Sequence, residues 1–191
     1  FPYTTLFRSE AILNNRNAIS NDLNPISNFI TKVLTSTSID FLKLEKMIEE
    51  IYDKTLLLRE EWYFYEGNEV ITTLRENDGS VRKIKIKNDK NKLIEVVPSE
   101  LYMESLKVKE ENFDIVDWFP NQTLIPNSRI SAKVDMKVSD LFDIRSLSCH
   151  ARLLSIINSF EDSQEKDALL LSFTSNLANC SKLVPPRSEE H

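Results

Sequence analysis

An acidic side chain that precedes a proline-started helix is the strongest candidate for chemistry in this sequence. Asp22 follows Ala18 and Ile19, which suit a short strand. Asn24 and Pro25 then mark the start of a helix, because Asn is a good cap and Pro suits the first helical position. A carboxylate at the carboxyl end of a strand in a doubly wound sheet accepts hydrogen bonds from the two ribose hydroxyls of a nucleoside cofactor. A carboxylate that merely caps the following helix has the same spacing, so both interpretations stay open.

A basic segment within an acidic chain is the second candidate. The whole chain has 24 Lys and Arg against 30 Asp and Glu, a formal charge of −6. In the segment 81–92, Asp89 stands alone against a group of cations. These are Arg82, Lys83, Lys85, Lys87, Lys90 and Lys92. In a strand, the lysines at 83, 85 and 87 share one face, opposite Ile84 and Ile86. Such a face suits DNA phosphates, whose binding weakens steeply with salt; an edge strand protected by lysines is the alternative.

Composition excludes several other kinds of site. The chain has only two glycines, so no glycine-rich phosphate loop lies in it. Cys149 and Cys180 lack metal-ligand spacing and the histidines number two, which argues against zinc and against a Cys/His nucleophile. No apolar run approaches the roughly 20 residues of a membrane span. Without a signal peptide, the sequence predicts a cytoplasmic protein with reduced thiols and no membrane partner.

Helices and a small sheet must position these candidates. Apolar residues recur at helical spacing from Phe41 to about Glu60, with Asp40 as the cap. Three β-prone runs then follow, and Gly79 lies in the turn between the first two. The predicted organisation is part of a nucleoside-binding domain at 10–61 (strand, helix, long helix), a small antiparallel β insertion at 62–97, an irregular connection at 98–138 and a helical hairpin at 139–186.

Four segments resemble one protein family. RNAISNDLNPISNFIT at 16–31 resembles GRRAIGIDLNPIATFIT of the DNA amino-methyltransferases, which modify adenine N6 or cytosine N4. Three later segments, LIPNSR at 124–129, VSDLFDIRSL at 138–147 and LLLSFTSNLANCSK at 169–182, follow that family's LIPNSR, VSDLFTKRNL and LLFAFTSNLAQASK in the same order. The matches cover about 80 residues, counted from these segments and the helix before them.

The resemblance implies a fold and a cofactor. It implies an α/β chain that holds part of a class I, Rossmann-like methyltransferase fold, with an inserted antiparallel β-hairpin region and a C-terminal helical hairpin. The cofactor is S-adenosylmethionine, with Asp22 as the ribose-binding acid and Leu23, Asn24 and Pro25 beside the adenosine. The partner is double-stranded DNA, contacted through Arg82, Lys83, Lys85 and Lys87, and a restriction endonuclease is a further partner of such enzymes.

The ends of the chain and two missing motifs suggest an internal fragment. FPYTTLFRS at 1–9 and RSEEH at 187–191 look like translated sequencing-adapter DNA, although a genuine N-terminal strand is the alternative for the first. The family's F-x-G-x-G and D-P-P-Y motifs do not occur in the sequence. We therefore expect the chain to be catalytically inactive alone. The rival hypothesis is a non-catalytic helical interaction or DNA-binding protein in which Asp22 is only a cap.

Overall fold

A computed structural model describes residues 3–36, 38–76, 78–88, 90–127 and 132–182. This part of the chain contains seven α-helices and one four-stranded antiparallel sheet. The helices are α1 (Tyr3–Leu13), α2 (Pro25–Leu34), α3 (Phe41–Lys54), α4 (Leu56–Trp62), α5 (Glu100–Asn112), α6 (Ile144–Ser159) and α7 (Gln164–Leu177). The strands are β1 (Phe64–Tyr65), β2 (Asn68–Arg75), β3 (Val81–Lys87) and β4 (Leu93–Val96).

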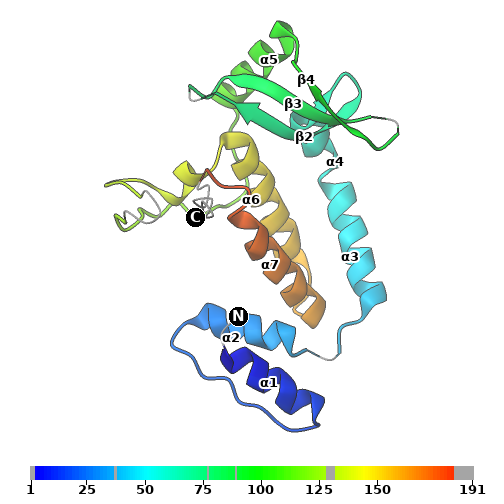
Figure 1. The fold of residues 1–191 in the computed structure, drawn as a ribbon, viewed down its shortest axis with the longest axis vertical. Helices are drawn as coiled ribbons and strands as arrows, with labels where there is room; N and C mark the ends of the chain where they lie inside the picture. The colour runs from blue at the N-terminus through cyan, green and yellow to red at the C-terminus, as the bar shows by residue number, and fades with distance from the viewer. Residues whose placement is uncertain (1–2, 37, 77, 89, 128–131, 183–191) are drawn as a thin grey trace, which may run out of the picture.

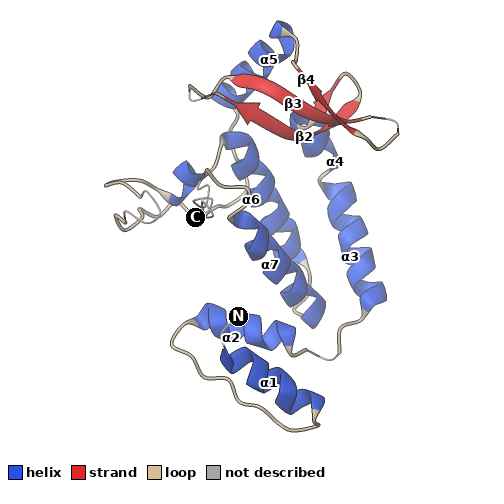
Figure 2. Cartoon of the chain, viewed as in Figure 1, coloured by secondary structure: helices blue, strands red, loops and turns tan. Residues whose placement is uncertain are grey.

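The elements form three groups along the long axis of the molecule. Figure 1 shows the sheet and α5 at one end, α6 and α7 with α3 beside them in the middle, and the pair α1 and α2 at the other end. All strands lie in the one sheet at the top of the view, as Figure 2 shows by colour. The expected nucleoside-binding segment and the basic strand therefore lie at opposite ends of the described structure.

Local capping explains where the first long helices begin and end. Asp40 Oδ1 accepts hydrogen bonds from the backbone N–H groups of Leu42 at 3.0 Å and Lys43 at 3.2 Å, which confirms the predicted cap of α3. The helix predicted to reach about residue 60 is divided at Thr55 into α3 and α4. The Thr55 hydroxyl donates to the carbonyl oxygen of Ile51 at 2.8 Å, and such a back-bond competes with the helical hydrogen-bond pattern.

The sheet buries one face against α5. Its strands run in the order β1-β2-β3-β4, and each neighbouring pair is antiparallel. Gly79 adopts φ +87° in the turn between β2 and β3, as the hairpin prediction requires. Ile84 and Ile86 point into a cluster with Tyr65 and Val70. Partly buried side chains close this cluster, namely Val81, Val96 and Tyr102. The alternation predicted for β3 is thus confirmed.

Helices α6 and α7 form the expected helical hairpin. Asp143 caps α6 by accepting the N–H of Ser146 at 2.7 Å, and Ser163 caps α7 by accepting the N–H of Lys166 at 3.2 Å. Their shared core consists of Met47 from α3, Ile157 from α6 and Leu169 from α7. A second hydrophobic cluster, separate from that of the sheet, therefore holds the helices together.

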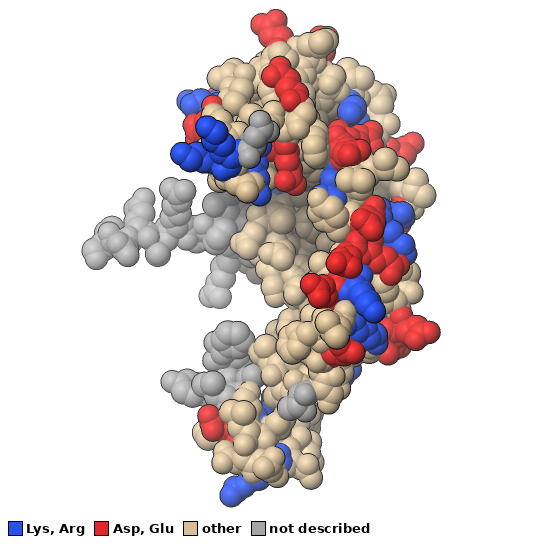
Figure 3. All heavy atoms as spheres, turned by 90° about the vertical axis from the view of Figure 1, so that its right-hand side faces the viewer, with Lys and Arg blue, Asp and Glu red and all other residues tan. Residues whose placement is uncertain are grey.

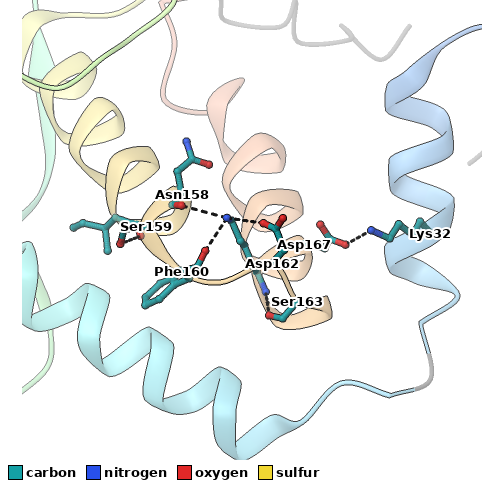
Figure 4. Close-up of polar contacts among 9 residues, drawn as sticks. Lys32, Asn158, Ser159, Phe160, Asp162, Ser163 and Asp167 are labelled. Atoms are coloured by element: carbon teal, nitrogen blue, oxygen red, sulfur yellow. Dashed lines mark hydrogen bonds and ion pairs between the residues drawn. The ribbon is translucent and has the colours of Figure 1, made fainter.

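Lys166 stabilises the turn between α6 and α7. Its Nζ donates to the carbonyl oxygens of Asn158 at 3.2 Å and Phe160 at 2.8 Å and to Asp162 at 3.0 Å, and Figure 4 labels these three acceptor residues. The carbonyl groups at the end of a helix lack helical partners, so one ammonium group satisfies several acceptors there. Nearby, Lys32 of α2 pairs with Asp167 of α7 at 2.5 Å and attaches the α1 and α2 pair to the hairpin.

Glu165 joins the start of α7 to the start of α3. Its Oε1 accepts the backbone N–H of Asp40 at 2.9 Å, and its Oε2 lies 3.0 Å from Lys43 Nζ. The side chain is only 6% exposed. The hydrogen bond from Asp40, followed by that from Lys43, lowers the pKa of Glu165 to about 2. The negative charge of Glu165 is therefore part of the folded structure.

We expect Glu165→Gln to lower the free energy of unfolding at pH 6. A carboxyl group whose pKa is lower in the folded state stabilises that state above its ordinary pKa of 4.5, and the stabilisation is lost as pH falls toward about 2. The difference between the variant and the unaltered chain, measured by urea unfolding, should shrink over that range. Glu161→Gln, at an exposed site just before α7, is the control; the same pH dependence in both variants would contradict this role.

The structure corrects the expected Rossmann-like part. Residues 16–22 form no strand and instead belong to a long loop between α1 and α2 (Figure 1). A strand needs a hydrogen-bonded neighbour, and in the described residues the only sheet is the antiparallel one at the far end. The prediction of a strand ending at Asp22 is therefore wrong for this chain, and no parallel sheet is present in its described part.

Other predicted segments differ less from the structure. Residues 3–9 of the adapter-like N-terminal stretch are helical, so they do not form the alternative N-terminal strand. Within the connection at 98–138, the sequence indicates a short helix at 100–109, and the structure forms the longer α5 there, which Ser99 caps by accepting the N–H of Tyr102 at 3.3 Å. The second adapter-like stretch, 187–191, and the end of the predicted hairpin at 183–186 lie outside the described residues.

Candidate functional site

The loop between α1 and α2 holds the residues predicted to bind a nucleoside. Asn24 Oδ1 accepts the N–H of Ile26 at 3.0 Å, and Pro25 is the first residue of α2. The predicted cap and the predicted proline position are both confirmed. Asp22 precedes this cap by two residues and so lies near the positive end of the α2 dipole, where negative charge is favourable.

Asp22 itself makes a local turn. Its Oδ1 accepts the backbone N–H of Asn24 at 2.9 Å, and its carbonyl oxygen accepts Asn28 Nδ2 at 3.0 Å. Among the described residues, no other hydrogen bond or ion pair to the Asp22 carboxylate is found. A carboxylate can accept about four hydrogen bonds, so most of this capacity is open to a ligand.

The remaining predicted contacts around Asp22 are exposed. Leu23 is fully exposed, and Ile19 is 92% exposed. A small pocket of about 160 Å³ lies between α1 and α2, where Ser20 and Asn28 line it but none of the residues 22–25 does. Asp22, Leu23, Asn24 and Pro25 are thus neighbours only because they are consecutive in the sequence. The described part of the chain forms no enclosed site around them.

The basic face occupies the outer side of the sheet. Its lysines at 83, 85 and 87 alternate with the buried Ile84 and Ile86, as predicted. Because β3 pairs with β2 on one side and β4 on the other, the lysines do not protect a sheet edge. The edge-strand explanation of the basic segment is therefore wrong.

Most of the predicted cationic contacts have acidic neighbours. Lys83 and Lys85 lie 3.6 and 3.3 Å from the carboxylate of Glu95 on β4. The hydrogen bond from Lys85, followed by the charges of both lysines, lowers the pKa of Glu95. Arg82 lies 3.4 Å from Glu76. Figure 3 accordingly shows basic and acidic side chains interspersed at the sheet end of this view.

The described structure also buries a cation whose burial the sequence did not indicate. Arg145 of α6 is 5% exposed, and its Nη1 donates to Thr73 Oγ1 of β2 at 3.2 Å. Its guanidinium carbon lies 4.9 Å from the centroid of the Tyr63 ring, and its Nε is buried without an acceptor among the described residues. In sequence, Arg145 falls beside the apolar stripe of α6, and the residues that it contacts, Thr73 of β2 and Tyr63, are distant in the sequence.

The groups next to Arg145 are not activated for catalysis. Burial raises the pKa of Tyr63, and burial also raises the pKa of Cys149. Both side chains therefore remain protonated at neutral pH, which makes neither a nucleophile nor a general base. The aromatic run that begins at Trp62 packs at the helix–sheet junction, with Trp62 1% and Tyr65 8% exposed, so these two rings cannot stack on bases.

The described residues form neither a metal site nor a membrane-spanning helix. In the residues that the structure describes, no three His, Cys, Asp or Glu side chains group in a way that could hold a metal ion. None of the described helices is long and apolar enough to cross a membrane.

Comparison with known proteins adds no relatives. No protein-family model matches the chain, and neither a curated protein nor a solved structure is detectably similar to it. The loop at Asp22 and the basic face of the sheet therefore remain the two sites from which a function can be argued.

Proposed function

We propose that this chain is part of an S-adenosylmethionine-dependent DNA methyltransferase that modifies an exocyclic amine of adenine or cytosine. The observation that carries the proposal is the arrangement of helix α1, the Asp22 carboxylate and the Asn-capped, Pro-started helix α2. Three later segments with the family's motifs follow in the family's order. Together these features support the resemblance better than any single motif does.

The residues of the loop fit the ribose end of the cofactor. The Asp22 carboxylate has acceptor capacity beyond its bond to Asn24 and would accept the ribose hydroxyls. Leu23, Asn24 and Pro25 would lie beside the adenosine. The cofactor supplies the methyl group. The F-x-G-x-G and D-P-P-Y motifs do not occur in this sequence. Methyl transfer would therefore take place on another part of a longer protein.

The exposure of apolar residues near Asp22 is consistent with this role. Ile19 is 92% exposed, Leu23 is fully exposed, and Ile26 at the start of α2 is 62% exposed. Removing such side chains from water is favourable by roughly 1.5–3 kcal/mol each when burial is complete. A neighbouring part of the longer protein that packs on this loop would bury them.

The positive charge of the basic face favours duplex DNA as the binding partner. Arg82, Lys83, Lys85 and Lys87 project from β3, an interior strand whose opposite face is the core of the sheet. In an acidic chain with a formal charge of −6, this is the part of the sequence with a local excess of cations. We assign it to the DNA backbone.

One observation favours the non-catalytic alternative. The hydrogen bond from Asn24 N–H to Asp22 Oδ1 is a local turn that needs no ligand, and residues 22–25 line no enclosed pocket among those found in the described structure. In that case the chain would be a helical interaction or DNA-binding protein, and only its basic face would have a function.

Substitution of Asp22 distinguishes the methyltransferase from the non-catalytic alternative. In a protein that carries this chain together with the F-x-G-x-G and D-P-P-Y loops, Asp22→Ala should weaken adenosylmethionine binding by about 1.5–3 kcal/mol, or about 10- to 150-fold, because the lost hydrogen bonds involve a charged acceptor. Isothermal titration calorimetry measures the change. Asp53→Ala, an exposed position on α3, is the matched control.

Two outcomes would contradict the methyltransferase proposal. One is equal cofactor affinity in the Asp22 and Asp53 variants. The other is a continuous reading frame around this chain that encodes neither the glycine loop upstream nor the catalytic loop downstream. Either result would leave the non-catalytic alternative.

A further inference from the structure

Hydrogen bonds of Asn88 connect the described residues between β3 and β4. Asn88 Oδ1 accepts the backbone N–H groups of Lys90 at 3.0 Å and Lys92 at 2.9 Å. The Asn88 N–H donates to the carbonyl oxygen of Lys92 at 3.0 Å, which closes the turn. Asn91 adopts φ +57°, a conformation that Asn tolerates better than most residues. With Lys87 at the end of β3, this turn presents three exposed ammonium groups.

These three lysines differ from the cations earlier in β3. Arg82, Lys83 and Lys85 each have a glutamate within 4 Å. In the described part of the chain, neither Lys87, Lys90 nor Lys92 forms an ion pair. Glu69 faces Lys87 across the β2–β3 ladder without pairing with it.

The chemistry of the turn favours a polyanion over a lipid surface. Residues 87–92 are only Lys, Asn and Asp, with Asp89 as the single acid, so the turn has no apolar side chain to insert into a bilayer. Lysine ammonium groups and asparagine amides are common donors to phosphate oxygens of DNA. An ammonium that has no carboxylate partner can release counterions when it meets a phosphate, whereas a paired ammonium must first lose its partner.

We propose that Lys87, Lys90 and Lys92 form the phosphate-contacting element of this chain and bind the backbone of duplex DNA. The choice of DNA rests on the proposed function, whereas the choice of lysines rests on the ion pairs of the sheet. The contacts are independent of base sequence, so they position the protein on the duplex without selecting a target. Arg82, Lys83 and Lys85 contribute less, because Glu76 and Glu95 already offset two of their three positive charges.

Two triple variants with the same change in charge test this assignment. The first is Lys87→Gln, Lys90→Gln and Lys92→Gln. The control is Arg82→Gln, Lys83→Gln and Lys85→Gln. Binding of the full chain to a fluorescein-labelled DNA duplex is followed by anisotropy between about 50 and 200 mM KCl, the range over which phosphate contacts are sharply weakened. Circular dichroism confirms that each variant is folded.

The expected results differ between the two variants. The logarithm of the binding constant falls linearly with the logarithm of the salt concentration. Loss of three phosphate contacts should make this negative slope shallower by about 2–3, since each contact contributes about 0.9. The control should lose less than half as much. Equal losses in the two variants, no salt-dependent binding by the unaltered chain, or tighter binding to vesicles of phosphatidylserine than to DNA would each overturn the proposal.

This test is independent of the cofactor site. Loss of DNA binding in the turn variant together with unchanged adenosylmethionine affinity in the Asp22 variant would support the turn and contradict the methyltransferase. The reverse result would support the cofactor site and remove the turn from the DNA interface.

Discussion

Replacing Trp62 with alanine should lower the free energy of unfolding by about 3–5 kcal/mol. The indole is 1% exposed and packs edge-on against Phe113, with ring centroids 4.9 Å apart and planes at 67°. It lies at the end of α4, where the helices meet the sheet. The substitution removes buried apolar area and leaves a cavity, because the helix end and the adjoining strand β1 are held by their own hydrogen bonds. Urea unfolding measures the change.

The other tryptophan provides the control for this prediction. Trp118 is 68% exposed, so Trp118→Ala should change the free energy of unfolding by no more than about 0.5 kcal/mol. The urea dependence of the free energy should be similar in both variants, which would show that the denatured state is not the cause. Similar losses at the two positions would contradict the burial of Trp62.

Replacing Ile157 with alanine should cost about 2–5 kcal/mol through the second hydrophobic cluster. Ile157 is 2% exposed on α6 and packs in the cluster that contains Met47 and Leu169. Three helices contribute to this cluster, so their backbones cannot all move to fill the space left by the side chain. Thermal unfolding followed by circular dichroism at a helical wavelength measures the loss.

Ile48 offers the same substitution on an exposed helix face. Its side chain on α3 is 50% exposed, and alanine has a higher helix propensity than isoleucine. We therefore expect Ile48→Ala to change the stability by no more than about 0.5 kcal/mol in either direction. If Ile157→Ala had an equally small effect, α3, α6 and α7 would not share the core that the structure shows.

Local rules of capping and periodicity determined much of the secondary structure from the sequence alone. The starts of α2 and α3 followed from Asn24, Pro25 and Asp40, because capping depends on hydrogen bonds within one turn. The turn at Gly79 and the two faces of β3 followed in the same way from conformational freedom and from the two-residue period of a strand. Each of these features involves residues close in the sequence.

Features that need a distant partner could not be predicted. The loop at 16–22 has the residue types of a strand, but a strand forms only where another strand supplies hydrogen bonds, and the described chain supplies none there. The buried guanidinium of Arg145 donates to Thr73 of β2, 72 positions away in the sequence. The periodicity of apolar residues within a helix or a strand does not show which distant residues that element will contact.

For the candidate sites, the sequence determined residue types and tertiary structure decided which of them are available to a ligand. The sequence identified Asp22 and the basic segment as candidate sites, and the structure leaves Asp22, Arg82 and Lys87 exposed. Only the structure showed that Glu95 on the neighbouring strand pairs with both Lys83 and Lys85, and that Lys87, Lys90 and Lys92 form no ion pair with any of the described residues. The physical reason is that an ion pair requires two side chains to lie within a few ångströms of each other, and strand pairing sets that distance.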